Sequence, residues 1–124
     1  MNDASNGIYA ACSEKGVFVR VVGRGIFLDS QPLRQYGSER MATHKEFYVD
    51  LRECQSMDST FLGVLAGFAL KLRNGGCLHL LNVAEPNLQS IRNLGLDRVA
   101  QVSSAKTEPA AAQESLEFKK LCSS

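Results

Sequence analysis

Two short segments rich in apolar and β-branched residues lie near the start of the chain, at residues 8–12 and 17–22. They flank the tetrapeptide 13–16, whose final glycine can adopt the positive φ of a tight turn. The pattern predicts a β-hairpin. The segment 23–25, which contains two glycines, is predicted to break the second strand.

The segment after the hairpin has the spacing of a helix. Asp29 or Ser30 can act as its N-cap, and Leu33, Tyr36 and Met41 then fall on its inner side. We therefore expect a helix to follow the hairpin.

A strand, a helix and a second strand are predicted in the middle of the chain. Residues 47–51 are typical of a strand and residues 77–81 of a second, continuous and buried one, and we expect the two to be parallel neighbours. The apolar segment 62–73 predicts the helix between them. It ends in basic residues, which suit the negative end of a helix dipole, and Asn-Gly-Gly at 74–76 supplies a left-handed stop.

A further helix is expected to start at Pro86, because proline is tolerated in a first turn. It runs through Ile91 and Leu94 and stops at Gly95, before a short strand or edge segment at 99–102. Strands and helices thus alternate along the chain. This order predicts an α/β fold.

The C-terminal part of the chain has a different composition. Residues 103–113 are mostly Ser, Ala, Lys, Thr, Glu and Pro, as in a linker. Leu116, Phe118 and Leu121 then suggest a short terminal helix. We predict one domain over residues 1–102, followed over 103–124 by a polar linker and a short helix or tail.

Composition and charge narrow the range of partners and locations. The 124 residues carry a formal net charge of +1, too small to attract nucleic acid or an anionic membrane. The most apolar run, 61–70, is about half as long as the ~20 residues needed to cross a bilayer, and no signal peptide is visible. We expect a cytoplasmic protein without direct membrane insertion, and its four scattered cysteines to be reduced.

The candidate chemistry lies at Asp58, Ser59 and Thr60, just before the central helix. Three small oxygen-bearing residues can cap the free N–H groups of a first helical turn, and the helix dipole there favours added negative charge. Thr60 is therefore a candidate phosphorylation site. The alternative is that the three residues only cap the helix.

No feature of the sequence indicates an enzyme. The sequence contains no Gly-x-x-x-x-Gly-Lys-Ser/Thr loop and no kinase signature. It also shows no nucleophile with its base, no paired carboxylates and no metal-ligand cluster. We expect no bound cofactor and no metal.

The central helix is apolar on two faces. Phe61, Val64 and Phe68 fall on the second of these, and we hypothesise that they form an exposed contact patch for a partner protein beside Thr60. The alternative is that the apolar residues of the C-terminal tail cover them.

Three segments of the chain resemble the STAS domain family, the group of anti-sigma-factor antagonists. Val-Asp-Leu at 49–51 followed by Met-Asp-Ser-Thr-Phe-Leu-Gly at 57–63 is similar to the family's strand and Asp-Ser-Ser/Thr motif. The Gly-Gly turn and strand at 75–81 and the Leu-Gly-Leu segment at 94–99 are similar to two further family segments. Together they cover roughly residues 16–102.

The resemblance implies a STAS-like mixed, mostly parallel sheet of four to five strands with packed helices, and a phosphoacceptor at Thr60. It also implies partners: a serine/threonine kinase that acts as an anti-sigma factor and binds the unmodified antagonist, and a metal-dependent phosphatase that resets it. Some STAS-like proteins are instead non-switching subunits of lipid ABC transporters or of sensory scaffolds. That alternative stays open, as does self-association.

Two residues differ from the family pattern. Phe61 stands where the family most often has glycine, and Ile26 stands where several antagonists have an acidic residue. Asp29 follows three positions later and is our candidate for that partner contact.

Overall fold

A computed structural model of the chain describes residues 6–104 and 116–121. The helices are α1 (Phe27–Arg40), α2 (Ser59–Leu72), α3 (Glu85–Leu94) and the 3-10 helix η2 (Leu96–Arg98). The strands are β1 (Gly7–Ser13), β2 (Gly16–Gly25), β3 (Glu46–Asp50), β4 (Cys54–Met57), β5 (Cys77–Leu81), β6 (Gln101–Val102) and β7 (Lys119–Leu121). None of the described helices is long and apolar enough to span a membrane.

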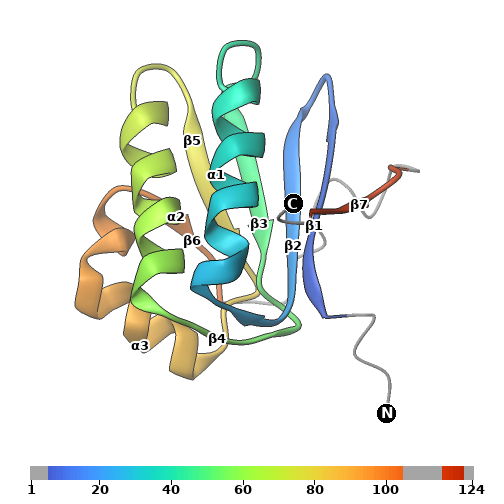
Figure 1. The fold of residues 1–124 in the computed structure, drawn as a ribbon. Helices are drawn as coiled ribbons and strands as arrows, with labels where there is room; N and C mark the ends of the chain where they lie inside the picture. The colour runs from blue at the N-terminus through green and yellow to red at the C-terminus, as the bar shows by residue number, and fades with distance from the viewer. Residues whose placement is uncertain (1–5, 105–115, 122–124) are drawn as a thin grey trace.

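The strands form one sheet in the order β6-β5-β3-β2-β1-β7, and β4 pairs separately with β2. Strands β2, β3, β5 and β6 run parallel to one another, whereas β1 is antiparallel to both β2 and β7. Helices α1 and α2 lie side by side on one face of the sheet (Figure 1). The predicted mixed, mostly parallel α/β fold is confirmed, with more strands than the four to five expected.

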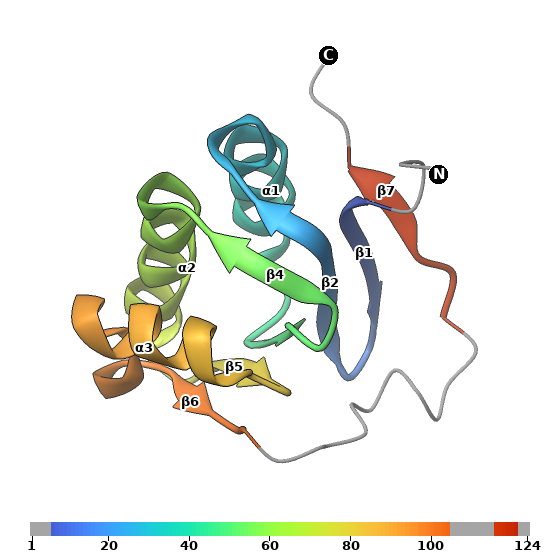
Figure 2. The same cartoon turned by 90° about the horizontal axis from the view of Figure 1, so that it is seen from below.

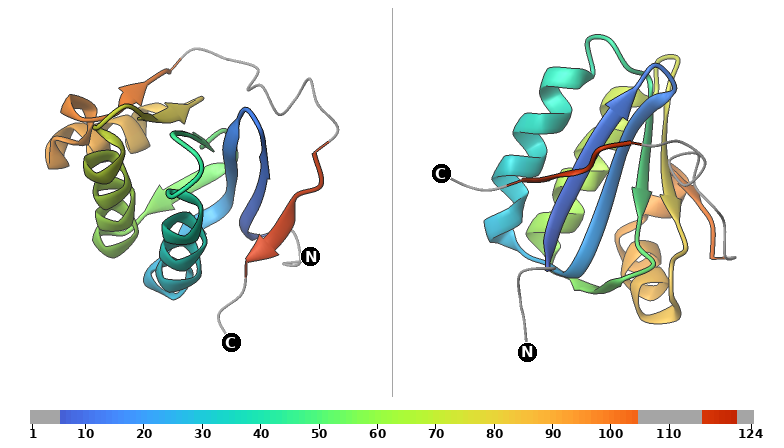
Figure 3. Two further views of the ribbon diagram at one scale, coloured as in Figure 1. Left: turned by 90° about the horizontal axis from the view of Figure 1, so that it is seen from above. Right: turned by 90° about the vertical axis from the view of Figure 1, so that its right-hand side faces the viewer.

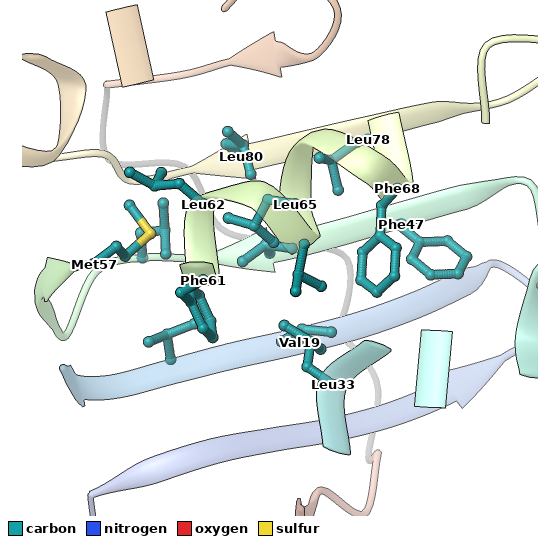
Figure 4. Close-up of a cluster of buried hydrophobic side chains, with 14 of the residues drawn as sticks. Val19, Leu33, Phe47, Met57, Phe61, Leu62, Leu65, Phe68, Leu78 and Leu80 are labelled. Carbon is teal, nitrogen blue, oxygen red and sulfur yellow. The ribbon is translucent and has the colours of Figure 1, made fainter. Parts of the chain in front are cut away.

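The core lies between this helix pair and the sheet. Alternate residues of the strands point to the helices, as the two-residue period of a strand requires, and meet the apolar side of α2 (Figure 4). The fully buried side chains include Leu33 of α1, Phe47 of β3, Leu65 of α2 and Leu78 of β5. This packing holds the starts of α1 and α2 in fixed positions.

The predicted hairpin is confirmed, and β3 and β5 are parallel neighbours as expected. However, β2 does not break at residues 23–25. It continues to Gly25 through an irregularity between Gly23 and Arg24, and pairs there with β4. The glycine at 25 is required, because a Cβ atom there would lie 2.7 Å from the Phe61 ring.

Helix α1 begins earlier than predicted, because its N-cap lies three residues before Asp29, the first predicted cap. Ile26 is the N-cap, and Asp29 lies within the first turn, where its Oδ2 accepts a hydrogen bond from the Ile26 N–H at 3.3 Å. Of the three predicted inner residues, Leu33 is buried, and Tyr36 and Met41 are partly buried against the core.

Both ends of α3 agree with the sequence pattern. Pro86 lies in its first turn, and Gly95 ends it with a left-handed φ of 83°. The expected edge segment is the short strand β6, which pairs with β5.

The C-terminal residues Lys119–Leu121 form a strand, not the predicted helix. Strand β7 pairs with β1 at the edge of the sheet opposite β6 (Figures 2 and 3). Most of the predicted linker lies outside the described residues. The domain boundary at residue 102 stays a prediction.

Candidate functional site at two adjacent helix starts

The Ser59 and Thr60 side chains are exposed in the first turn of α2. Their position follows from the local sequence, because Asp58 is the N-cap and these are the first two residues of the helix. An enzyme can therefore approach either hydroxyl from solvent.

Asp58 connects the starts of two helices. Its Oδ1 accepts a hydrogen bond from the Phe61 N–H at 2.8 Å, which caps α2. Its Oδ2 accepts a hydrogen bond from the Phe27 N–H at 2.8 Å, at the first residue of α1. The backbone N–H of Asp58 in turn donates to the Gly25 carbonyl at 2.9 Å. A single carboxylate thus satisfies one free N–H in each helix, and the capping predicted for Asp58 is present.

The electrostatics of this region favour negative charge. Two helix N-termini meet around Asp58, and each contributes partial positive charge from its unpaired N–H groups. Helix α2 has no acidic residue in its first turn apart from this cap. A phosphate on Ser59 or Thr60 would therefore lie at the positive end of α2.

The structure contradicts the predicted contact patch. Phe61, Val64 and Phe68 are only 0%, 4% and 3% exposed, so none of them can contact a partner on this surface. Figure 4 shows Phe61 and Phe68 pointing from α2 into the core.

The proposed covering by the tail is also wrong. Gly25 of β2 lies against the Phe61 ring, and Gly37 of α1 lies against the Phe68 ring. The tail instead reaches β1, and Phe118 stacks on the Arg20 guanidinium, whose carbon is 4.3 Å from the ring centroid. The second apolar face of α2 is thus covered by α1 and β2.

Two other apolar side chains are exposed beside the site. Phe27 and Leu28, the first two residues of α1, are 63% and 58% exposed, and the Phe27 N–H is bonded to Asp58. Neither residue was predicted from the sequence as a contact residue. The signal was available: both stand directly before Asp29, and a helix that begins three residues earlier places them in an outward-facing first turn.

Two further titratable side chains, His79 and Cys54, have structural partners. His79 lies 2.6 Å from the Glu46 carboxylate, measured from Nε2 to Oε1, and stacks on Tyr48. Burial raises the pKa of the Cys54 thiol to about 11. Within residues 6–104 and 116–121 there is no group of three or more side chains that could hold a metal ion.

Comparison with solved structures identifies the fold. An anti-sigma factor antagonist from Mycobacterium paratuberculosis is 19% identical, with 91% of this chain and 97% of that chain covered and a TM-score of 0.67. The anti-sigma factor antagonist SpoIIAA in its unphosphorylated form is 18% identical, covering 84% and 92%, with a TM-score of 0.65.

A third neighbour has a different description. It is a sulfate transporter family protein from Wolinella succinogenes, 18% identical, covering 77% and 79%, with a TM-score of 0.62. Neither the family models nor the curated proteins give a match to the sequence. The protein therefore has the fold of the STAS domain. Identities this low show the fold alone, and the same fold occurs in antagonists and in a transporter family protein.

Proposed function

We propose that this chain is an anti-sigma-factor antagonist that works as a phosphorylation switch. In its unmodified form it binds a serine/threonine kinase that also acts as an anti-sigma factor, and phosphorylation of Thr60 releases it. The observation that carries the proposal is the exposed hydroxyl pair at the start of α2. The neighbour SpoIIAA, described as a Bacillus cell fate determinant, also has a structure in a phosphorylated form, with a TM-score of 0.64.

The phosphoryl transfer needs no catalytic group from this chain. The Thr60 Oγ1 attacks the γ-phosphorus of ATP held by the kinase, a new O–P bond forms, and the bond to the ADP oxygen breaks. The hydroxyl proton passes to a base of the kinase. Hydrolysis by a metal-dependent phosphatase restores the hydroxyl. The chain is thus a substrate and a binding protein, not an enzyme, and it works in the cytoplasm with its kinase.

The fold tolerates the added charge, whereas an interface does not. A phosphate brings a charge of about −1.5 to −2, and the positive end of α2 stabilises it by about 0.3–1 kcal/mol. In a complex, the same dianion would have to lose its hydration, and each ~1.4 kcal/mol of that cost weakens binding tenfold. Phosphorylation therefore releases the partner without unfolding this protein.

The partner surface in this proposal is the first turn of α1, in place of the buried patch. A kinase that reaches Thr60 must cover the surroundings of Asp58, and Phe27 is hydrogen-bonded to that carboxylate. Burying Phe27 and Leu28 removes two large apolar side chains from water. Asp29, in the same turn, is half-buried and stays a candidate contact.

The test is incubation with a candidate kinase and ATP, followed by location of the phosphate by mass spectrometry. We expect one phosphate on Thr60, lost in Thr60→Ala. Ser59→Ala is the necessary companion, because Ser59 is also exposed, one residue away. Phosphate on Ser59 alone would keep the switch and move its acceptor by one residue.

Partner capture provides the second measurement. Thr60→Glu should bind the kinase at least about tenfold more weakly than Thr60→Ala. Thr43→Glu, at an exposed threonine in the loop after α1, is the matched control and should bind normally. No phosphate on either hydroxyl, together with equal binding of both Thr60 variants, would contradict the proposal.

A non-switching subunit is the second candidate function, favoured by the likeness to a sulfate transporter family protein. In that case Phe27 and Leu28 form part of a permanent interface with a transporter or sensory scaffold. Stable co-purification that is insensitive to Thr60→Glu would support this alternative.

A further inference from the structure

A groove runs beside the edge of β6 that faces away from β5, where no other described strand pairs, and none of the residues at the Thr60 site line it. Its volume is about 550 Å³. Its walls come from the end of α3, from η2 and from the edge strand, including Leu88, Arg92, Arg98, Gln101 and Val102. This is enough space for several residues of an extended peptide.

Among the described strands, none pairs with the outer side of β6. Ser103 directs both of its backbone groups toward β5 and the segment that follows it: its N–H donates to the Leu80 carbonyl at 2.9 Å, and its carbonyl accepts from the Val83 N–H at 3.0 Å. Backbone groups alternate in direction along a strand, so the N–H and carbonyl of Val102 point away from β5, toward the groove side. An added strand would find hydrogen-bonding groups there.

The charged side chains of the groove favour an anionic ligand. Arg92 and Arg98 both line it, and within the described residues neither guanidinium has an ion-pair partner. Asp97 is the single acidic residue among the lining residues. Guanidinium groups bind carboxylates in a two-point geometry, so two unpaired arginines beside a strand edge select acidic side chains.

We infer that this groove binds an extended acidic segment of a partner protein, which adds as a strand to β6. Main-chain hydrogen bonds to Val102 supply the pairing, and carboxylates of the segment pair with Arg92 and Arg98. The partly buried Leu88 and Val99 receive its apolar residues. The site is independent of Thr60, and unmodified protein suffices to test it.

The probe is a fluorescein-labelled hexapeptide of alternating Glu and Val, titrated into the full chain and followed by anisotropy. The same peptide with Lys in place of Glu is the control ligand. We expect the acidic peptide to bind at least about tenfold more tightly than the basic one. Equal binding of the two peptides, or no binding of either, would overturn the inference.

The protein variants test the two contacts separately. Arg92→Glu with Arg98→Glu should weaken binding of the acidic peptide at least about tenfold, whereas Arg34→Glu on α1 should not.

The backbone contact is tested at Val102. Val102→Pro removes the outward N–H and should abolish strand addition. If that variant does not fold, slower hydrogen exchange of the Val102 amide on adding peptide gives the same information. An exchange rate of the Val102 amide that does not change on adding peptide contradicts strand addition.

Light scattering tests for a second copy of this chain in the groove. A dimer that is lost in the Arg92→Glu, Arg98→Glu double variant would assign the groove to that second copy and overturn the inference.

Discussion

The Asp58 carboxylate accepts a hydrogen bond from the Phe27 N–H, 31 residues earlier in the chain, at a distance of 2.8 Å. The same carboxylate caps α2 through the Phe61 N–H. The start of α1, with its exposed apolar pair, is therefore tied to the helix that bears Thr60. A phosphate on Thr60 would place a dianion two residues from the group that joins the helices.

Removal of this carboxylate should destabilise the fold through both helices. Asp58→Ala loses two hydrogen bonds to a charged acceptor and should lower the free energy of unfolding by about 2–3 kcal/mol. Asp58→Asn keeps one acceptor oxygen and should lose about 1 kcal/mol. Urea denaturation measures both, and Ser59→Ala, at an exposed side chain, should change little. Equal stability of Asp58→Ala and the unmodified chain would show that the carboxylate does not hold the two helices.

Replacement of Phe68 distinguishes a core residue from a contact residue. Its ring meets Phe47 edge-on, with centroids 5.6 Å apart, and is almost fully buried. Phe68→Ala should therefore cost about 3–5 kcal/mol of stability. Thermal unfolding measures this loss. Leu70→Ala, on the exposed side of the same helix, is the control and should leave the melting temperature nearly unchanged. A Phe68→Ala protein as stable as the unmodified chain would instead support the exposed contact patch that the sequence predicted.

Two helical glycines should respond to alanine in opposite directions. A Cβ at Gly37 would lie 2.4 Å from the Phe68 ring, so Gly37→Ala should destabilise the fold by about 1–3 kcal/mol despite the better helix propensity. No atom lies within 4 Å of a Cβ at Gly67, and Gly67→Ala should stabilise α2 by about 0.5–1 kcal/mol. Paired urea denaturation curves compare them. Stabilisation by Gly37→Ala would mean that α1 does not pack closely on the Phe68 ring, and destabilisation by Gly67→Ala would contradict the open space at that position.

The buried Cys54 thiol should make stability fall at high pH. Burial raises its pKa from 9.0 to about 11, so the folded state holds this proton more tightly than the unfolded chain does. Its contribution to stability is full below pH 9 and is lost as the pH rises from about 9 to about 11. The difference between the unmodified chain and Cys54→Ala, measured across this range, isolates the effect from the tyrosines. A difference that does not change with pH would contradict it.

The sequence pattern predicted an element correctly where residues close together in the chain determine its backbone conformation. Pro86 and Gly95 define α3, and Asp58 caps α2, because a proline at a helix start, a glycine at a helix end and a capping carboxylate act within one turn. The strand around Val49 was predictable for a similar reason, since it is a short run of aromatic and β-branched residues in which Phe47 and Val49 are buried.

Two strands, β4 and β7, were not predicted from the sequence, and both depend on a partner that is distant in the chain. Strand β4 has little β character, and it exists because β2 runs on past Gly23 and offers it a partner. Lys119–Leu121 becomes a strand for the same reason, since the edge of β1 is available to it. Pairing with a distant segment overrode the local preference in both cases.

The sequence by itself determined the N-terminal hairpin, the central strand, helix and strand, the cap of α2, both ends of α3 and the hydroxyl pair at the start of α2, since each depends on residues a few positions apart. Only the tertiary structure decided which apolar side chains remain outside. Phe61, Val64 and Phe68 are covered because α1 packs against α2, while Phe27 and Leu28 stay in solvent because that helix starts at their position. Burial depends on which elements meet in space, and the helical pattern of one segment contains no information about the neighbour that covers it.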